Sequence, residues 1–494
     1  MPKNRVLKSL KSNVLFQLLS AGNQILLVPI FLYFWGVEKY GVWLTIIVIS
    51  SFFSLVDFGM GHYLPNQLSR LKNRNKIREY NLVLGIFASV FILVSIFFII
   101  MGVIISTPIS QNIILNSADV LIDSKVRESL IILFSLNIFQ SIFNFSALIY
   151  ISSNDYYKTS QRRNQIAILN VILIPVGLYF HADYAEIAAI MFINYMVIEV
   201  ISLMDVFKRY KFVQLKILPL RKKIIKKYYL KSIWLAFVKV YEIGYQGIPI
   251  ILIQMFLSPI IVVIFSTHRT LVNTALQLKQ IIIGIVWREG TILFALNKIK
   301  EIANMYLFSQ KIILYFSLIV SFAVVSYGNT IFTYWLNGEV EFDYLLMGLM
   351  LIVALAQVPW MSAETILLSK SEAKFIVIAK VGYLFLYTFL GFISLYVYDN
   401  LYYLVTSNIV LNIFVLNYPI LKELHIHIGV TRDVFIARIA APFLIMFIYA
   451  VVAIIYFQES EYILIVSYII MIAILIFDLY RTDFHFLQKI KFKE

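Results

Sequence analysis

The segment KSIWLAFVKVYEIGYQGIPIILIQMFL, Lys231–Leu257, is an apolar run that carries charged residues near its middle. About 20 apolar residues in one helix are enough to cross a hydrocarbon core about 30 Å thick. Lys239, Glu242 and Gln246 follow at i, i+3 and i+7, which places them on one helical stripe. Charges within a membrane span are costly, so they normally face the interior of a helix bundle or water. The segment therefore predicts a spanning helix with a polar face inside a bundle.

Apolar runs of similar length recur throughout the 494 residues, of which 61% are hydrophobic and only 14% charged. A soluble protein would carry about a quarter charged residues. Strand-type alternation is absent from these runs, so we predict an all-α, polytopic membrane protein. About fourteen transmembrane helices are expected, at approximately 14–34, 41–62, 81–105, 129–152, 166–181, 186–206, 232–257, 259–286, 312–335, 344–369, 375–397, 402–420, 436–456 and 462–479.

The basic residues orient these spans. Only Lys39, Lys125 and Arg127 fall in the predicted outside loops when the N-terminus is placed inside, whereas most of the 42 Lys and Arg fall in inside segments. Positive residues in short loops mark the cytoplasmic side, so we expect both termini to be cytoplasmic. The net charge of +15 then reflects topology and attraction to anionic membrane lipids, and nucleic-acid binding is not needed to explain it.

Several classes of chemistry have no support in the sequence. The chain has no cysteine, which excludes disulfides, thiolate metal sites and a cysteine nucleophile. No Walker A, HExxH or GxSxG motif is present, and the histidines lack the spacing of metal ligands. No stretch between the spans is long enough for a soluble catalytic domain. We therefore expect no catalytic residues, metal or cofactor, and transport without covalent chemistry is the economical inference.

The helix beginning near residue 14 and the opening segment share a pattern. Lys11-Ser12 precedes Val28-Pro29-Ile30-Phe31-Leu32 by the same interval at which Lys231-Ser232 precedes Ile248-Pro249-Ile250-Ile251-Leu252. A duplication with interrupted helices is typical of secondary transporters, whose binding site lies between the repeats near the midplane. We predict two pseudo-symmetric six-helix bundles, with the domain boundaries 1–206, a basic cytoplasmic linker at 207–231, 232–421, and 422–494 with two additional helices and a basic tail.

The polar residues within the spans predict a hydrated, cationic cavity. The spans hold five bases against Glu199, Glu242, Glu364 and the borderline Glu289, an excess that favours an anionic substrate. Structural alternatives remain open for each: Lys239 and Glu242 could neutralise one another, Lys279 and Lys380 could extend to the headgroups, and proline is ordinary in membrane helices. The predicted substrate-binding residues are Lys239, Arg269, Lys279, Lys380, Gln246 and Asn273, the ion-coupling candidates are Glu242 and Glu364, and the structural or gating candidates are Asp57, Pro29 and Pro249.

Two segments carry a family resemblance. The stretch FLYFWGVEKYGVWLTIIVISSFFSLVDFGMGHYLPNQLSRLKNRNK, Phe31–Lys76, resembles Wzx-type polysaccharide flippases (O-antigen and capsule exporters) of the multidrug/oligosaccharidyl-lipid/polysaccharide (MOP) exporter superfamily. The residues that carry it are Gly36, Tyr40-Gly41 and Asp57-Phe58-Gly59-Met60, followed by a basic loop. VVIFSTHRTL, Val262–Leu271, is similar to helix eight of that family. The resemblance implies a MATE-like fold.

It also implies a function. A flippase of this kind moves an undecaprenyl-diphosphate-linked oligosaccharide, such as an O-antigen, capsule or exopolysaccharide repeat unit, from the cytoplasmic to the outer leaflet by alternating access. H⁺ or Na⁺ would be the possible counter-ion, and a polysaccharide polymerase and a chain-length regulator the possible protein partners. Two alternatives stay open: a MATE-type drug or cation efflux antiporter, and, in another class, a membrane-embedded O-antigen polymerase or ligase.

Overall fold

The computed structural model describes residues 3–57, 60–105, 124–142, 144–214, 216, 218–219, 222–277, 279–369, 374–457 and 461–491. Within these ranges the regular structure is helical, and no strand occurs. Hydrocarbon offers no partner to a backbone N–H or C=O, so a spanning chain forms either helices or a closed barrel. The predicted all-α class is confirmed.

Ten helical stretches in the described part of the chain are long and apolar enough to cross a membrane, the first being Leu15–Leu55. This stretch merges the first two predicted spans. Nine further predicted spans coincide with the other nine stretches, and the predicted spans 166–181, 259–286 and 462–479 coincide with helices outside the ten. The chain is therefore a multi-pass membrane protein.

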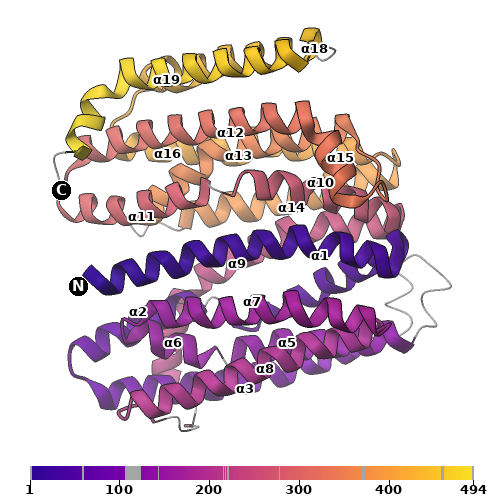
Figure 1. The fold of residues 1–494 in the computed structure, drawn as a ribbon. Helices are drawn as coiled ribbons and strands as arrows, with labels where there is room; N and C mark the ends of the chain where they lie inside the picture. Colours follow the sequence, from indigo (N-terminus) through magenta and orange to yellow (C-terminus); the bar gives the residue numbers. More distant parts are fainter. Residues whose placement is uncertain are drawn as a thin grey trace. The chain divides into compact units, whose positions relative to one another are not determined.

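The chain divides into two compact units, Met1–Val263 and Ile264–Glu494. The helices of the first unit follow the chain from the indigo end of Figure 1, with α10 crossing into the second unit. They are α1 (Lys3–Ser51), the 3-10 segment η1 (Phe52–Asp57), α2 (Met60–Asn73), α3 (Ile77–Ile105), α5 (Ser124–Ile142), α6 (Phe145–Ser152), α7 (Tyr156–Tyr179), α8 (Tyr184–Arg209), α9 (Lys222–Phe256) and α10 (Pro259–Ala275). Helix α9, which the sequence assigned to the second half, packs against α1, α2 and η1 and belongs to the first unit.

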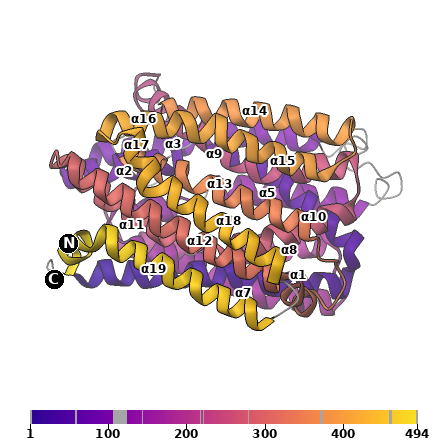
Figure 2. The same ribbon diagram turned by 90° about the horizontal axis from the view of Figure 1, so that it is seen from above.

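The second unit contains the remaining helices. Helix α19 lies along α12 and α18 in this unit (Figure 2). The elements are α11 (Lys279–Ala295), α12 (Ile299–Leu336), α13 (Tyr344–Ser369), α14 (Lys374–Tyr396), α15 (Leu401–Leu411), the π-helical segment η3 (Asn412–Asn417), α16 (Tyr418–Ile428), α17 (Arg432–Phe435), the π-helical segment η4 (Ile436–Ala440), α18 (Ala441–Phe457) and α19 (Glu461–Lys491).

Helix α1 contains a sharp turn at Gly36, where φ is 73° and ψ is 174°. A side chain would be strained at this backbone conformation, so glycine is the residue that permits the turn. The predicted helices 14–34 and 41–62 are thus two arms joined at Gly36, and the second arm tightens into η1 before it reaches residue 62. The predicted helix 259–286 is likewise two helices, α10 and α11.

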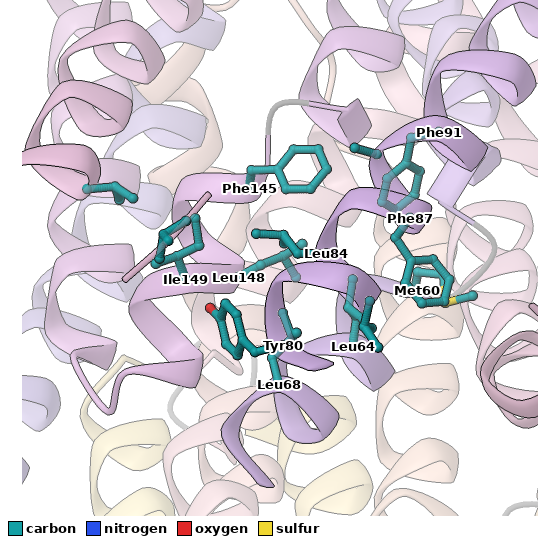
Figure 3. Close-up of a cluster of buried hydrophobic side chains, with 14 of the residues drawn as sticks. Met60, Leu64, Leu68, Tyr80, Leu84, Phe87, Phe91, Phe145, Leu148 and Ile149 are labelled. Carbon is teal, nitrogen blue, oxygen red and sulfur yellow. The ribbon is translucent and has the colours of Figure 1, made fainter. Parts of the chain in front are cut away.

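A core of buried apolar side chains joins α2, α3 and α6 in the first unit. Figure 3 shows side chains of the three helices converging, with Leu64 and Leu68 from α2, Leu84 and Phe87 from α3, and Leu148 from α6. The described residues of this cluster also include Val213, from the linker after α8. The linker is therefore part of the packed core of the first unit at this point.

The linker follows α3 for about two helical turns, from Asn81 to Ser89. Asn81 donates from Nδ2 to the Phe212 carbonyl (2.8 Å) and accepts from the Gln214 N–H (3.0 Å). Two turns further, the Ser89 hydroxyl donates to the Leu218 carbonyl (2.6 Å) and accepts from the Leu218 N–H (3.1 Å). The hydrogen bonds of Asn81 and Ser89 therefore hold these linker residues on α3.

The start of the linker is fixed by Tyr210, whose hydroxyl donates to the Asp155 carboxylate. Burial, and then this hydrogen bond, raises the pKa of the Tyr210 phenol, so it remains the proton donor at neutral pH. Lys72 lies over the rings of Tyr210 and Phe212, at 5.5 and 4.9 Å from their centroids. These contacts attach the linker to α2 and to the residues between α6 and α7.

Candidate functional site

Lys239 of α9 is the predicted substrate ligand with the most informative contact. Its side chain is half-buried, and Nζ donates to the backbone carbonyl of Ser54 at 2.5 Å. Ser54 lies in η1, where the helix tightens from i+4 to i+3 hydrogen bonding. Hydrogen bonds in a 3-10 segment have poorer geometry than in an α-helix, so its carbonyls are suited to accept from a side chain. The lysine thus joins α9 to the end of the second arm of α1.

The other contacts between these two helices form a continuous line, which we term the α1–α9 seam. The buried Thr45 hydroxyl donates to Gln254 Oε1 at 3.2 Å. Gly247 faces Val48, and a Cβ added at Gly247 would lie 2.9 Å from Val48 Cγ1. One side of the seam consists of Gly41, Thr45 and Val48 of α1 with Phe52 and Ser54 of η1. The other side consists of Lys239, Gly247 and Gln254 of α9 with Pro259, the first residue of α10.

The remaining candidates of the first unit are placed as follows. Glu242 and Gln246 are exposed, and no ion pair between Lys239 and Glu242 is among the contacts of the described residues. Pro249 is buried within α9, and Pro29 is half-buried within α1. The side chain of Asp57 lies outside the described residues. Along the predicted stripe of α9, Lys239 therefore contacts η1, whereas Glu242 and Gln246 are exposed.

In the second unit, Arg269 and Asn273 lie one helical turn apart on α10. The Arg269 guanidinium is half-buried and lies over the Phe265 ring, 5.2 Å from its centroid. Asn273 is exposed, and Lys279 is buried at the first residue of α11. Lys279 thus lies at the start of a helix, whereas the sequence predicted one continuous helix at 259–286.

Glu364 and Lys380, predicted separately as an ion carrier and a substrate ligand, form an ion pair. Lys380 Nζ lies 2.6 Å from Glu364 Oε1, and the side chains are only 4% and 11% exposed. Lys380 also lies over the Trp360 ring, at 5.3 Å from the centroid. Because Lys380 on α14 has a carboxylate neighbour on α13, an anionic ligand that binds to this lysine would have to share it with Glu364.

A buried polar network extends from this pair into η3. Trp360 Nε1 donates to Asn412 Oδ1 at 2.9 Å, and Asn412 Nδ2 donates to Asn408 Oδ1 at 2.6 Å. The Tyr383 hydroxyl donates to the same Asn408 oxygen, also at 2.6 Å. Asn412 is the first residue of the π-helical segment, and such segments often occur at functional sites. The network supplies hydrogen-bond partners to polar groups that would otherwise be costly at membrane depth.

One buried charged pair lies outside the predicted site. Arg162 on α7 forms an ion pair with Glu199 on α8, and the guanidinium also donates to Ser146 Oγ (3.2 Å) and Asn144 Oδ1 (2.9 Å). Sequence reasoning missed Arg162 because it began the helix at 166, whereas α7 begins at Tyr156. Glu199 could have indicated this pair, since a carboxylate within a span usually pairs with a base from a neighbouring helix.

A second missed pair links α12 to α19. Lys311 is fully buried and pairs with Asp478, which also accepts from the Tyr315 hydroxyl at 2.6 Å. Lys311 was assigned to an inside loop because the helix was expected to begin at 312, whereas α12 begins at Ile299. Hydropathy places a helix start where the apolar run begins, so it overlooks the helical residues before that run, even where another helix buries one of them.

The comparisons with known proteins agree with this architecture. No protein-family model matches the sequence, and no curated protein matches it. Among solved structures, the chain is similar to the lipid II flippase MurJ in an inward closed conformation, with a TM-score of 0.67 and 13% identity over 96% of this chain and 99% of that chain.

Two MATE transporters also match. One is an inward-facing multidrug resistance transporter of the MOP superfamily, with a TM-score of 0.62 and 14% identity over 84% of this chain and 94% of that one. The other is a mutant of VcmN from Vibrio cholerae, with a TM-score of 0.59 and 13% identity over 87% and 99%. These similarities show that the chain has the fold of MOP-superfamily transporters.

Proposed function

We propose that this chain is a flippase that carries an undecaprenyl-diphosphate-linked oligosaccharide from the cytoplasmic to the outer leaflet of a bacterial inner or plasma membrane. The observation that supports it most is the fold shared with a lipid II flippase along almost the entire chain. The resemblance of Phe31–Lys76 to polysaccharide flippases supports the same substrate class. Alternating access would expose the headgroup site to each side in turn.

The bases within the spans suit an acidic headgroup. Arg269 offers a planar set of donors that matches phosphate geometry, and Lys239, Lys279 and Lys380 offer point charges. Gln246 and Asn273 are exposed polar side chains one or two turns from Lys239 and Arg269, where they suit sugar hydroxyls. Outward movement of a negative headgroup runs with an inside-negative potential, which contributes about 2.3 kcal/mol per charge per 100 mV.

Partners follow from the same proposal. Glu242 is exposed and Glu364 is paired with Lys380, so each is a candidate to carry H⁺ in a counter-transport step, and Na⁺ is the alternative ion. Anionic lipids would contact the basic cytoplasmic segments. A polymerase and a chain-length regulator would use the exported unit. Asp57, Pro29 and Pro249 remain candidates for gating positions.

The second candidate is a drug or cation efflux antiporter, because MATE transporters share the fold. A cationic substrate is best held by carboxylates, and the excess of bases in the spans argues against it. An O-antigen polymerase or ligase is supported less, since the neighbouring structures are transporters and the sequence provides no outside loop longer than about two dozen residues.

Deletion of the gene tests the function directly. Cells without the protein should accumulate lipid-linked repeat units in the cytoplasmic leaflet and lose surface polysaccharide, because the unit is made but not moved. Leaflet location is measured by the accessibility of the glycan to an impermeant glycosidase in right-side-out and inverted vesicles. Loss of polymer with the repeat units on the outer leaflet would contradict the proposal and favour the polymerase.

The variant Arg269→Ala tests the headgroup interaction. We expect export to fall at least about tenfold, because charge-assisted hydrogen bonds to phosphate are worth about 1.5–3 kcal/mol. Arg269→Lys should restore part of the activity, since it keeps the charge and loses the planar donors. The control is Arg432→Ala, at an exposed position in α17. Export is measured with equal amounts of each variant in the membrane, and full export by Arg269→Ala would remove this residue from the mechanism.

A further inference from the structure

We propose that His268 is a positioning residue for the headgroup: its hydrogen bonds fix the rotation of α10 and thereby the direction of Arg269. The inference rests on the proposed function, because it takes Arg269 to bind the phosphate of the substrate. His268 itself is fully buried, with 0% of its surface exposed, so it would act through its neighbour and not by touching the substrate.

The imidazole of His268 is hydrogen-bonded at both ring nitrogens. Nδ1 lies 2.7 Å from the carbonyl oxygen of Ile264, which can only accept, so Nδ1 carries the proton. Nε2 therefore accepts from the backbone N–H of Asp343 at 2.9 Å. The first bond joins the ring to its own helix, and the second joins it to the segment that precedes α13. Together they hold a neutral imidazole in one orientation.

Asp343 is in turn held by two other helices. Its carboxylate accepts from the Leu346 N–H at 2.9 Å, in the first turn of α13, and from the Tyr402 hydroxyl at 2.8 Å, in the first turn of α15. Because its side chain is fixed in this way, its backbone N–H is a well-placed anchor for His268. One hydrogen bond thus connects α10 to the beginnings of α13 and α15, all within the second unit.

Two aromatic rings pack against the imidazole. The ring centroid of His268 lies 4.6 Å from that of Phe332 and 5.4 Å from that of Phe342. Phe342 packs against Gly328, where an added Cβ would lie 2.7 Å from the phenyl ring. Gly328 lies about two turns before the end of α12 at Leu336, so the chain returns along α12 before it begins α13. The side of α10 that carries His268 is therefore closely packed.

The direction of Arg269 follows from that of His268. Adjacent residues of a helix lie about 100° apart around its axis, so fixing one side chain fixes the direction of the next. A rotation of α10 by about 20° would move a group about 6 Å from the axis by about 2 Å. Charge-assisted hydrogen bonds to phosphate are about 2.7–2.9 Å long, so a displacement of this size would break one.

Two amide side chains of different length test the role of His268. In His268→Gln the side-chain oxygen reaches about as far as Nε2 and can accept from the Asp343 N–H, whereas the amide of His268→Asn is too short. The measurement is equilibrium binding of undecaprenyl diphosphate to the purified protein. His268→Asn should weaken binding about tenfold, the value of one charge-assisted hydrogen bond. His268→Gln should bind within about twofold of the parent, the usual scatter of such comparisons.

A double-mutant cycle separates positioning from a purely structural role. In the Arg269→Ala background, His268→Asn should cause no further loss of binding, because the group that it positions is absent. Its effect on thermal unfolding should be the same in both backgrounds, because the lost bond to Asp343 does not involve Arg269. The control is Gln310→Leu, which breaks another buried bond of the second unit, from Gln310 Nε2 to the Pro359 carbonyl at 2.8 Å. It should lower stability and leave binding unchanged.

The outcomes distinguish this proposal from the proposed function. If the parent does not bind undecaprenyl diphosphate, the proposed function fails. If the parent binds and either His268→Asn or Arg269→Ala binds equally well, the positioning role is overturned while the function stands. An equal loss with and without Arg269 also overturns it, since His268 would then act through another group.

A second variant serves if His268→Asn does not accumulate in the membrane. Phe342→Leu removes one of the two rings that pack against the imidazole and leaves the hydrogen-bonding groups of His268 and Asp343 in place. It should weaken binding when Arg269 is present and have no effect in the Arg269→Ala background. Unchanged binding by Phe342→Leu in the parent background would contradict the proposal.

Discussion

Replacement of Arg162 by methionine should destabilise the folded protein by about 3–5 kcal/mol, because it leaves Glu199 buried without its base. Two further acceptors, Asn144 Oδ1 and Ser146 Oγ, would lose their donor in the same variant. The measurement is thermal unfolding of the purified protein in detergent, with the amount of folded protein in the membrane as a second readout.

The double variant Arg162→Met/Glu199→Met decides whether the cost comes from the unpaired charge. Apolar replacement of both members of a buried pair is often close to neutral, so the double variant should recover most of the lost stability. Arg163→Met is the matched control: the neighbouring arginine is exposed and lies over the Phe16 ring at 4.3 Å, a contact worth about 1 kcal/mol or less. Equal destabilisation by Arg163→Met would show that the pair has no special role.

Asp478→Ala should release α19 from α12 and remove the carboxylate that pairs with the buried Lys311, again at a cost of about 3–5 kcal/mol. The effect should be concentrated in the C-terminal helices, because Asp478 accepts from both Lys311 and Tyr315 of α12. Hydrogen exchange followed by mass spectrometry should therefore show faster exchange in α19 before the rest of the second unit.

Tyr315→Phe separates the two contacts of Asp478. It removes only the neutral donor and should cost about 1 kcal/mol, with little change in the exchange of α19. Lys311→Met/Asp478→Leu should restore protection of α19 because no charge remains buried. A uniform loss of protection throughout the second unit in Asp478→Ala would contradict a local anchoring role.

The sequence predicts the positions of the membrane spans better than it predicts where helices end or which residues contact each other. The positions of the spans were predictable because apolar runs report the cost of placing each residue in lipid, and that cost depends mainly on the residue itself. Helix ends were less predictable: Arg162 and Lys311 lie in the parts of α7 and α12 that precede the predicted spans, and neighbouring helices bury them. The kink at Gly36 and the break after Ala275 were found only from the three-dimensional structure.

In the candidate site, the sequence likewise identified the charged residues but not their partners. Sequence alone identified Lys239, Glu364 and Lys380 as charges that need a reason to be in a membrane, because their desolvation cost is evident from the residue type and its place in an apolar run. Whether those residues bind substrate stays a prediction. Their partners could not be predicted, since a lysine in a span can interact with a carboxylate, a backbone carbonyl or an aromatic ring.

The sequence by itself determined that this is an all-α membrane protein with charged residues inside its spans, because hydrophobic burial is nearly additive along the chain. Only the tertiary structure decided that Lys380 pairs with Glu364, that Lys239 contacts the Ser54 carbonyl, and that α9 packs with the first unit. These contacts join residues far apart in the chain and depend on distances of a few ångströms, and no local pattern of residue types encodes such distances.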